Sequence, residues 1–233
     1  TTEIYTLSLH DALPIWISNM NQDQIKQLNE AVEAVKTRKI ENVYFVACGG
    51  SKAIFDPAQF IFDRETTLPS FVYNANEFIH RCPKGLGENS LVVTCSHSGN
   101  TLETTRATQL AGDKGALTIS FSYRVDSPLW KATQHPISYV WGPESNPGDN
   151  NNGMLYRLVF SILNVLQPNE KYERAIKACD NLGKVYEANK AKFAESAKAF
   201  GKKYKNNKLI YTMSSGPCYG VAYSFAICLD RKS

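Results

Sequence analysis

Three hydroxyl side chains lie within six consecutive residues at positions 96–101, which read Ser-His-Ser-Gly-Asn-Thr. A buried apolar run precedes this segment and an amphipathic stretch follows it, so we expect a turn that leads from a strand into a helix. The hydroxyls of Ser96, Ser98 and Thr101, with the amide hydrogens of the first helical turn, are suited to cradle a phosphate monoester. In a second interpretation Asn100 or Thr101 only caps the helix, and the spacing alone does not separate the two.

A second turn with candidate chemistry reads Cys-Gly-Gly-Ser at positions 48–51, directly after another buried run. Gly49 and Gly50 let backbone amides approach a ligand closely, and the Ser51 hydroxyl adds a donor where a helix starts. A dinucleotide site needs Gly-x-Gly-x-x-Gly and an acidic residue after the next strand, and neither is present. Taken by itself, this segment is most simply a tight turn.

Other candidate side chains indicate neither metal nor cofactor chemistry. No P-loop lysine pattern is present, which argues against nucleotide hydrolysis. His80 and His135 have no partners at metal-ligand spacing, so we expect no metal and no cofactor. Cys48 has no adjacent base and is predicted to serve in packing. Glu77 is placed to contact substrate hydroxyls from beyond a strand end, although a solvated or helix-capping carboxylate is more ordinary.

The elements that must position these turns alternate regularly along the chain. Apolar runs at residues 43–47, 71–73, 91–95, 117–121 and 137–141 predict buried strands. Helix candidates lie at residues 21–39, 53–64, 76–80, 102–113 and 128–133. This order predicts an α/β fold, a three-layer αβα sandwich with a five-stranded parallel sheet. Ligands of such sheets bind at the carboxyl ends of the strands.

After this region the chain is helical and then begins to repeat itself. Further helix candidates occupy residues 154–166, 171–182 and 184–204. Aligning Gly49 with Gly216 also aligns the strand residue Val43 with Ile210, so we expect one strand and one helix of a second α/β unit from residue 209. One strand and one helix cannot close a core, and we therefore expect a truncated chain.

The amino-acid composition limits which binding partners and which cellular compartment we expect. The 233 residues are 43% hydrophobic and carry a net charge of +4, too small a surplus to predict a nucleic-acid partner. The six cysteines form no Cys-x-x-Cys pair, which favours a reducing, cytoplasmic compartment. The longest apolar run, residues 155–166, is interrupted by Arg157 and Asn164, so we expect no membrane partner.

The two turns taken together resemble the paired signature of sugar isomerase (SIS) domains, as in the isomerase half of glucosamine 6-phosphate synthase. The surrounding sequence is more similar to the fructosamine 6-phosphate deglycases, which act on fructoselysine or fructose-asparagine phosphates. That similarity rests on residues 44–51, 73–74, 77–78, 86–89, 126–129 and 210–212 and covers about residues 20–231. It implies a flavodoxin-like SIS domain followed by the start of a second SIS repeat.

The resemblance also implies which residues hold the substrate. It assigns the phosphate to Ser51, Ser96, Ser98 and Thr101, and to His97, which stands where the synthases have an amide side chain. Gly49, Gly50, Gly99, Asn100 and Glu77 are expected to support them. The implied reaction moves protons at C1 and C2 of an open-chain ketosamine 6-phosphate, releasing an amine and leaving an aldose 6-phosphate.

In that family a glutamate and a histidine of the second domain catalyse the reaction. This chain ends before such a segment, so we assign no catalytic residue and expect the chain alone to be inactive. The implied organisation is a non-native or unstructured leader at 1–18, a first SIS domain at 19–168, a helical linker at 169–207 and a truncated second domain at 208–233. We expect the complete protein to be a homodimer or a higher homo-oligomer.

Two alternative functions stay open. One is an aminosugar or ketose–aldose phosphate isomerase of the glucosamine 6-phosphate synthase type. The other is a non-catalytic sugar-phosphate sensor. Sensors of the transcriptional type resemble an SIS domain preceded by a helix-turn-helix, which the single helix at 21–39 does not supply.

Overall fold

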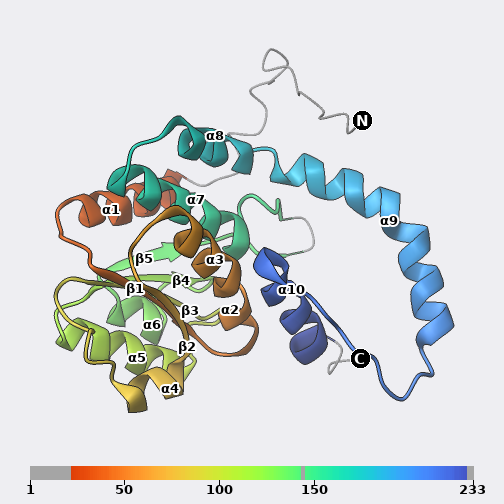
Figure 1. Ribbon diagram of the computed structural model, residues 1–233, viewed down its shortest axis with the longest axis horizontal. Helices are drawn as coiled ribbons and strands as arrows, with labels where there is room; N and C mark the ends of the chain where they lie inside the picture. The colour runs from red at the N-terminus through yellow and green to blue at the C-terminus, as the bar shows by residue number, and fades with distance from the viewer. Residues whose placement is uncertain (1–21, 143–144, 230–233) are drawn as a thin grey trace.

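The computed structural model describes residues 22–142 and 145–229, and the expected leader at 1–18 lies outside them. Five parallel strands form a sheet in the order β2-β1-β3-β4-β5 (Figure 1). The strands are β1 (Asn42–Ala47), β2 (Ser70–Asn74), β3 (Ser90–Cys95), β4 (Leu117–Ser122) and β5 (His135–Ser138). This order confirms the expected flavodoxin-like α/β sheet.

Helices cover both faces of the sheet, as the three-layer prediction requires. One face carries α1 (Gln22–Lys36), α3 (Phe55–Glu65) and α7 (Asn151–Leu166). The other carries α4 (Ala75–Arg81) and α5 (Leu102–Asp113), with α6 (Pro128–Ala132) packed beside α5 and against β4. Because side chains alternate along a strand, Phe45 points to the first face and Tyr44 and Val46 to the second.

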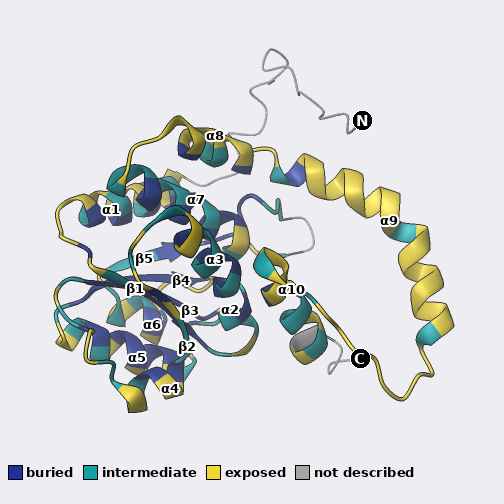
Figure 2. Ribbon diagram, in the orientation of Figure 1, coloured by how far each residue is buried: buried dark blue, intermediate teal, exposed yellow. Residues whose placement is uncertain are grey.

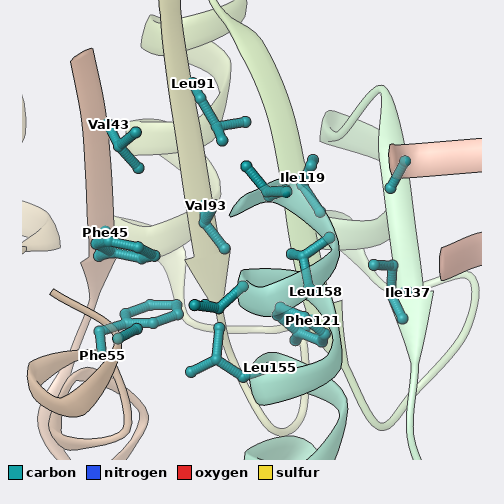
Figure 3. Close-up of a cluster of buried hydrophobic side chains, with 14 of the residues drawn as sticks. Val43, Phe45, Phe55, Leu91, Val93, Ile119, Phe121, Ile137, Leu155 and Leu158 are labelled. Carbon is teal, nitrogen blue, oxygen red and sulfur yellow. The ribbon is translucent and has the colours of Figure 1, made fainter. Parts of the chain in front are cut away.

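The larger core lies between the sheet and the first group of helices. Figure 3 shows Phe45 of β1, Phe55 of α3 and Leu155 of α7 among its side chains. The Phe45 and Phe55 rings lie 5.4 Å apart between centroids. Each side chain of this kind contributes about 1.5–3 kcal/mol when it is fully buried, so this cluster fixes the sheet beneath the two turns.

The helix predicted at residues 53–64 begins slightly later in the structure, as α3 (Phe55–Glu65), and a separate short helix α2 (Gly49–Ala53) precedes it. Ile54 separates the two helices. Pro57 causes the break, because it has no N–H to donate to the carbonyl of Ala53, four residues earlier.

The predicted last strand, residues 137–141, is also shifted. β5 ends at Ser138, since its partner strand β4 ends at Ser122, the residue that pairs with Ser138. The Ser138 amide, on the outer edge of β5, donates to Gln27 Oε1 of α1 at 2.8 Å. Trp141 therefore lies beyond the sheet, and its side chain is 52% exposed.

The C-terminal part begins with α8 (Glu170–Cys179) and α9 (Leu182–Tyr204), which is exposed along most of its length (Figure 2). The prediction of a strand from residue 209 is wrong, because residues 209–215 form no regular secondary structure. Among the described residues, no strand lies beside this segment to form hydrogen bonds with it. The helix expected after it is present. It comprises a 3₁₀ turn η2 (Gly216–Cys218), α10 (Tyr219–Ser224) and a π turn η3 (Phe225–Leu229), and it packs against α2 and α3.

Candidate functional site

The two candidate turns lie next to each other at the carboxyl edge of the sheet. β1 and β3 are adjacent and in register, with Ala47 opposite Cys95. The chain turns to β2 on one side of this pair and to β4 on the other, so the turns occupy the switch point at which ligands of open α/β sheets bind. The Thr104 hydroxyl lies 3.9 Å from the Cys48 sulfur. This contact links the helix that follows the turn at residues 96–101 to the turn at residues 48–51.

The hydroxyl of Thr101 is directed away from its own helix. Thr101 is the N-cap residue of α5, yet its side chain makes no capping hydrogen bond. Its Oγ1 instead lies 2.9 Å from Ser96 Oγ. Helices usually satisfy their first amides with a side-chain acceptor. Here no side-chain cap occupies the amides of the first turn of α5, which excludes the interpretation of this segment as a simple Thr101 cap.

The remaining hydroxyls differ in how far they are exposed. Ser96 is 2% exposed and lies behind Thr101, which is half-buried. Ser98 is also half-buried, and its Oγ accepts a hydrogen bond from the Asn100 amide at 3.2 Å. That bond uses a lone pair of the oxygen, so the hydroxyl proton of Ser98 stays available for another acceptor.

Backbone hydrogen bonds tie the turn at 96–101 to the neighbouring elements. The Ser96 amide donates to the carbonyl of Phe121 at 3.1 Å, and the Tyr123 amide donates to the carbonyl of His97 at 3.1 Å. The carbonyl of Gly99 accepts from the Leu129 amide of α6 at 3.0 Å. The turn is therefore held by both β4 and α6.

The turn at residues 48–51 forms the start of α2, with Gly49 in the left-handed region at φ +54°. Ser51, on this helix, forms a hydrogen bond with the thiol of Cys95 at the end of β3. Burial raises the pKa of Cys95 to about 12, so this thiol stays neutral at physiological pH. Ser51 thus connects the ends of the two central strands.

His97 belongs to a group of aromatic rings beside the turn. Its Nδ1 lies 2.9 Å from the buried hydroxyl of Tyr139, and its ring stacks on Tyr123 at 5.2 Å between centroids. The ring of Trp141 meets it edge-on at 4.9 Å. Partial burial, and secondarily the positive charge of Arg124, lower the pKa of His97 below its ordinary value of 6.5, which favours a neutral ring at pH 7.

Comparison with known proteins places this geometry in a family. The model of the SIS domain family matches residues 36–166, more than half of the chain. The chain belongs to the SIS domain family. The matched region of this SIS domain contains both turns and all five strands of the sheet.

The relatives of this SIS domain include deglycases. The chain is 46% identical to the fructosamine deglycase FrlB of Bacillus subtilis over 88% of its own length and 62% of that protein. It is 28% identical to the fructoselysine 6-phosphate deglycase of Escherichia coli K12 over 84% of its own length and 57% of that protein. A Bacillus subtilis crystal structure described as a phosphosugar isomerase superposes with a TM-score of 0.85 at 46% identity, covering 87% of this chain and 62% of that one.

Glu77 lies in a different setting from the hydroxyls. It follows β2 on α4, it is exposed, and its carboxylate pairs with Arg81 on the same helix at 2.5 Å. Within residues 22–142 and 145–229, no three His, Cys, Asp or Glu side chains gather as a metal site would require. No helix of the described SIS domain is long and apolar enough to cross a bilayer.

Sequence reasoning missed the aromatic group around His97. The apolar run at residues 137–141 predicts a buried strand that includes Tyr139 and Trp141, and no sequence pattern singles out Tyr123. Their positions just after β4 and β5 were the available signal, because the carboxyl ends of neighbouring parallel strands meet at one edge of the sheet.

Proposed function

We propose that this SIS domain binds the phosphate group of a sugar phosphate as part of a fructosamine 6-phosphate deglycase. The observation that carries the proposal is the start of α5, where amides without a side-chain cap adjoin the hydroxyls of Ser98 and Thr101. The similarity to a fructosamine deglycase and a fructoselysine 6-phosphate deglycase supports it. The chain spans 62% of the first of these relatives, so the activity of the whole protein belongs to the proposal.

Each hydroxyl has a distinct part in holding the phosphate. Thr101 and Ser98 are half-buried and donate directly to phosphate oxygens, while Ser96 sits behind Thr101 and fixes its rotamer. Ser51 approaches from the neighbouring turn at the end of β1. A phosphate dianion at the start of α5 gains charge-assisted hydrogen bonds and the favourable end of the helix dipole, and it needs neither lysine nor metal.

The glycines make room for the ligand. Gly49 and Gly99 both have positive φ angles, +54° and +67°, which turn the chain sharply after β1 and β3. Gly50 and Asn100 complete these two turns. Neutral His97 borders the phosphate site on the side toward β5 and adds no positive charge to it.

The proposed reaction of the complete protein releases an amine from a ketosamine 6-phosphate and leaves an aldose 6-phosphate. It requires a base for a proton at carbon and an acid for the departing nitrogen. We assign neither to this chain, whose part is to hold the phosphate end. Helix α1 packs against β5 and α7, so it is part of the sandwich and not of a helix-turn-helix.

Ligand-dependent thermal unfolding tests the proposed function. Fructose 6-phosphate is expected to raise the melting temperature and unphosphorylated fructose is not, because a ligand that binds the folded state stabilises it by mass action. The double variant Ser98→Ala/Thr101→Val removes two half-buried donors and is expected to lose most of the protection.

Ser196→Ala is the matched control, since it removes an exposed hydroxyl on α9 that bonds only to the carbonyl of Phe193. This variant is expected to keep the full shift. Equal protection of the wild type and the Ser98→Ala/Thr101→Val variant would disprove phosphate binding at this turn.

A further inference from the structure

The aromatic group beside the phosphate turn is open to solvent. Tyr123 is 44% and Trp141 52% exposed, and both contact the ring of His97, which is exposed as well. Tyr139 lies beneath them at 2% exposure and anchors His97 through its hydroxyl. Exposed aromatic rings that are held in a fixed arrangement, rather than scattered singly, indicate a binding surface.

This surface continues the proposed phosphate site along the edge of the sheet. His97 stands between Ser96 and Ser98 in the turn after β3, Tyr123 follows β4, and Trp141 follows β5. Neighbouring strands are about 4.8 Å apart, so the rings extend about 10 Å from the phosphate turn. A cleft of about 700 Å³ opens on the far side of Trp141, between the end of the sheet and α9.

We propose that the rings of His97, Tyr123 and Trp141 hold the amine portion of the ketosamine 6-phosphate. This inference rests on the proposed function, because the phosphate turn fixes the other end of the ligand. The secondary amine of a ketosamine is cationic, and the faces of tryptophan and tyrosine rings attract such cations. The cleft beyond Trp141 leaves room for amines of different length.

Arg124 brings a positive charge beside the rings, and the ring of His97 adds none. His97 is neutral because partial burial lowers its pKa, so it does not repel a cationic nitrogen. Arg124 directly follows Tyr123, and its charge is close enough to act on His97. A guanidinium at this position is suited to a carboxylate, which makes an amino acid the amine that the surface fits best.

Calorimetric titration with two ligands tests the inference. Fructose 6-phosphate carries the phosphate and no amine, whereas fructosylglycine 6-phosphate carries both. The Tyr123→Ala/Trp141→Ala variant is expected to bind fructosylglycine 6-phosphate about tenfold more weakly than the wild type. Its Kd for fructose 6-phosphate is expected to change less than about twofold, because the phosphate contacts remain.

A second comparison tests whether Arg124 binds the carboxylate of the ligand. Arg124→Ala is expected to weaken the binding of fructosylglycine 6-phosphate. It is expected to leave unchanged the Kd for the ketosamine 6-phosphate of methylamine, which has no carboxylate. The controls are Arg174→Ala, an exposed arginine on α8, and Phe200→Ala, an exposed ring on α9. Both are expected to bind all three ligands as the wild type does.

The outcomes separate this inference from the proposed function. If the wild type binds fructose 6-phosphate and Tyr123→Ala/Trp141→Ala binds both ligands equally well, the aromatic surface is not the amine site and the phosphate site stands. An equal loss for both ligands shows a structural role of the rings and also overturns the inference. Failure of the wild type to bind fructose 6-phosphate overturns both proposals.

Discussion

Gly99 determines, at the level of a single residue, the shape of the turn at residues 96–101, where we propose that phosphate binds. Its φ of +67° lies in the left-handed region, and a Cβ added there would come within 2.0 Å of Ser127 Oγ. The carbonyl of the same residue holds the Leu129 amide. The positive φ and the lack of space beside Ser127 both require glycine at this position.

Gly99→Ala is therefore expected to lower the free energy of unfolding by about 3 kcal/mol, from backbone strain and overpacking together. Urea denaturation measures the change. Gly49→Ala is the control, because Gly49 has a similar φ of +54° and no atom within 4 Å of the added Cβ. Strain alone predicts a loss of about 1 kcal/mol there, and equal losses at both glycines would show that contact with Ser127 is unimportant.

The hydroxyls of the site could be predicted from the sequence, but the rings could not. Ser98 and Thr101 stand out because a strand, a short polar segment and a helix follow one another along the chain. Tyr123 and Trp141 are 18 residues apart in numbering and meet His97 only through the order of three strands. The hydrogen bond between Tyr139 and His97 also depends on where β5 ends, and the apolar run predicted that end three residues too late.

At the scale of elements, an ion pair between a buried arginine and a half-exposed aspartate joins α7 to the residue that follows α8. Arg157 has a side-chain exposure of 8%, and its Nη1 lies 2.7 Å from the carboxylate of Asp180. Its Nε also donates to the carbonyl of Gly148 at 3.3 Å. The arginine thus connects the loop before α7 with the end of α8.

Asp180→Ala removes the carboxylate that pairs with this buried guanidinium and is expected to lower the free energy of unfolding by about 2 kcal/mol. Chemical denaturation measures the loss. Glu170→Ala removes the exposed pair of Glu170 with Arg174, whose side chains are 88% and 72% exposed. A change within about 0.5 kcal/mol is expected for this control, and a similar change for Asp180→Ala would refute the structural importance of the Arg157–Asp180 pair.

Apolar runs predicted the five strands and their succession along the chain, because strands buried on both faces are continuous apolar runs. It did not predict the break at Ile54, which depends on the missing amide of Pro57. The segment from residue 209 has a strand-like composition and yet forms no strand, since a strand also requires a hydrogen-bonding neighbour. The local sequence pattern thus identified candidate strands, and hydrogen-bonding partners determined which of these candidates form strands.

At the scale of the whole molecule, the C-terminal helix α10 packs against α2, the short helix that begins in the turn at residues 48–51. Gly220 lies so close to α2 that an added Cβ would be 2.1 Å from the carbonyl of Ala53. Gly49 and Gly216 have nearly the same φ, +54° and +58°, and each is the first residue of a short helix or helical turn. This similarity supports our proposal that residues 208–233 begin a second unit after a first domain at 19–168 and a linker at 169–207.

Gly220→Ala is expected to separate α10 from α2 without disturbing the sheet. Hydrogen exchange then increases at the amides of residues 219–224 and stays unchanged in β1 and β3. Gly201→Ala, in α9, is the control, because its added Cβ meets no atom within 4 Å. It is expected to leave exchange in α10 unaltered, and slow exchange in Gly220→Ala would contradict the close packing of the two helices.

The attachment of residues 96–101 to β4 and α6 has a consequence for the energetics of binding. Three backbone hydrogen bonds fix this segment when the protein folds, before any ligand arrives. Such preorganisation reduces the conformational entropy that association must overcome. We therefore expect nearly identical backbone coordinates with and without a bound anion, and an association rate governed by diffusional encounter instead of a slow rearrangement.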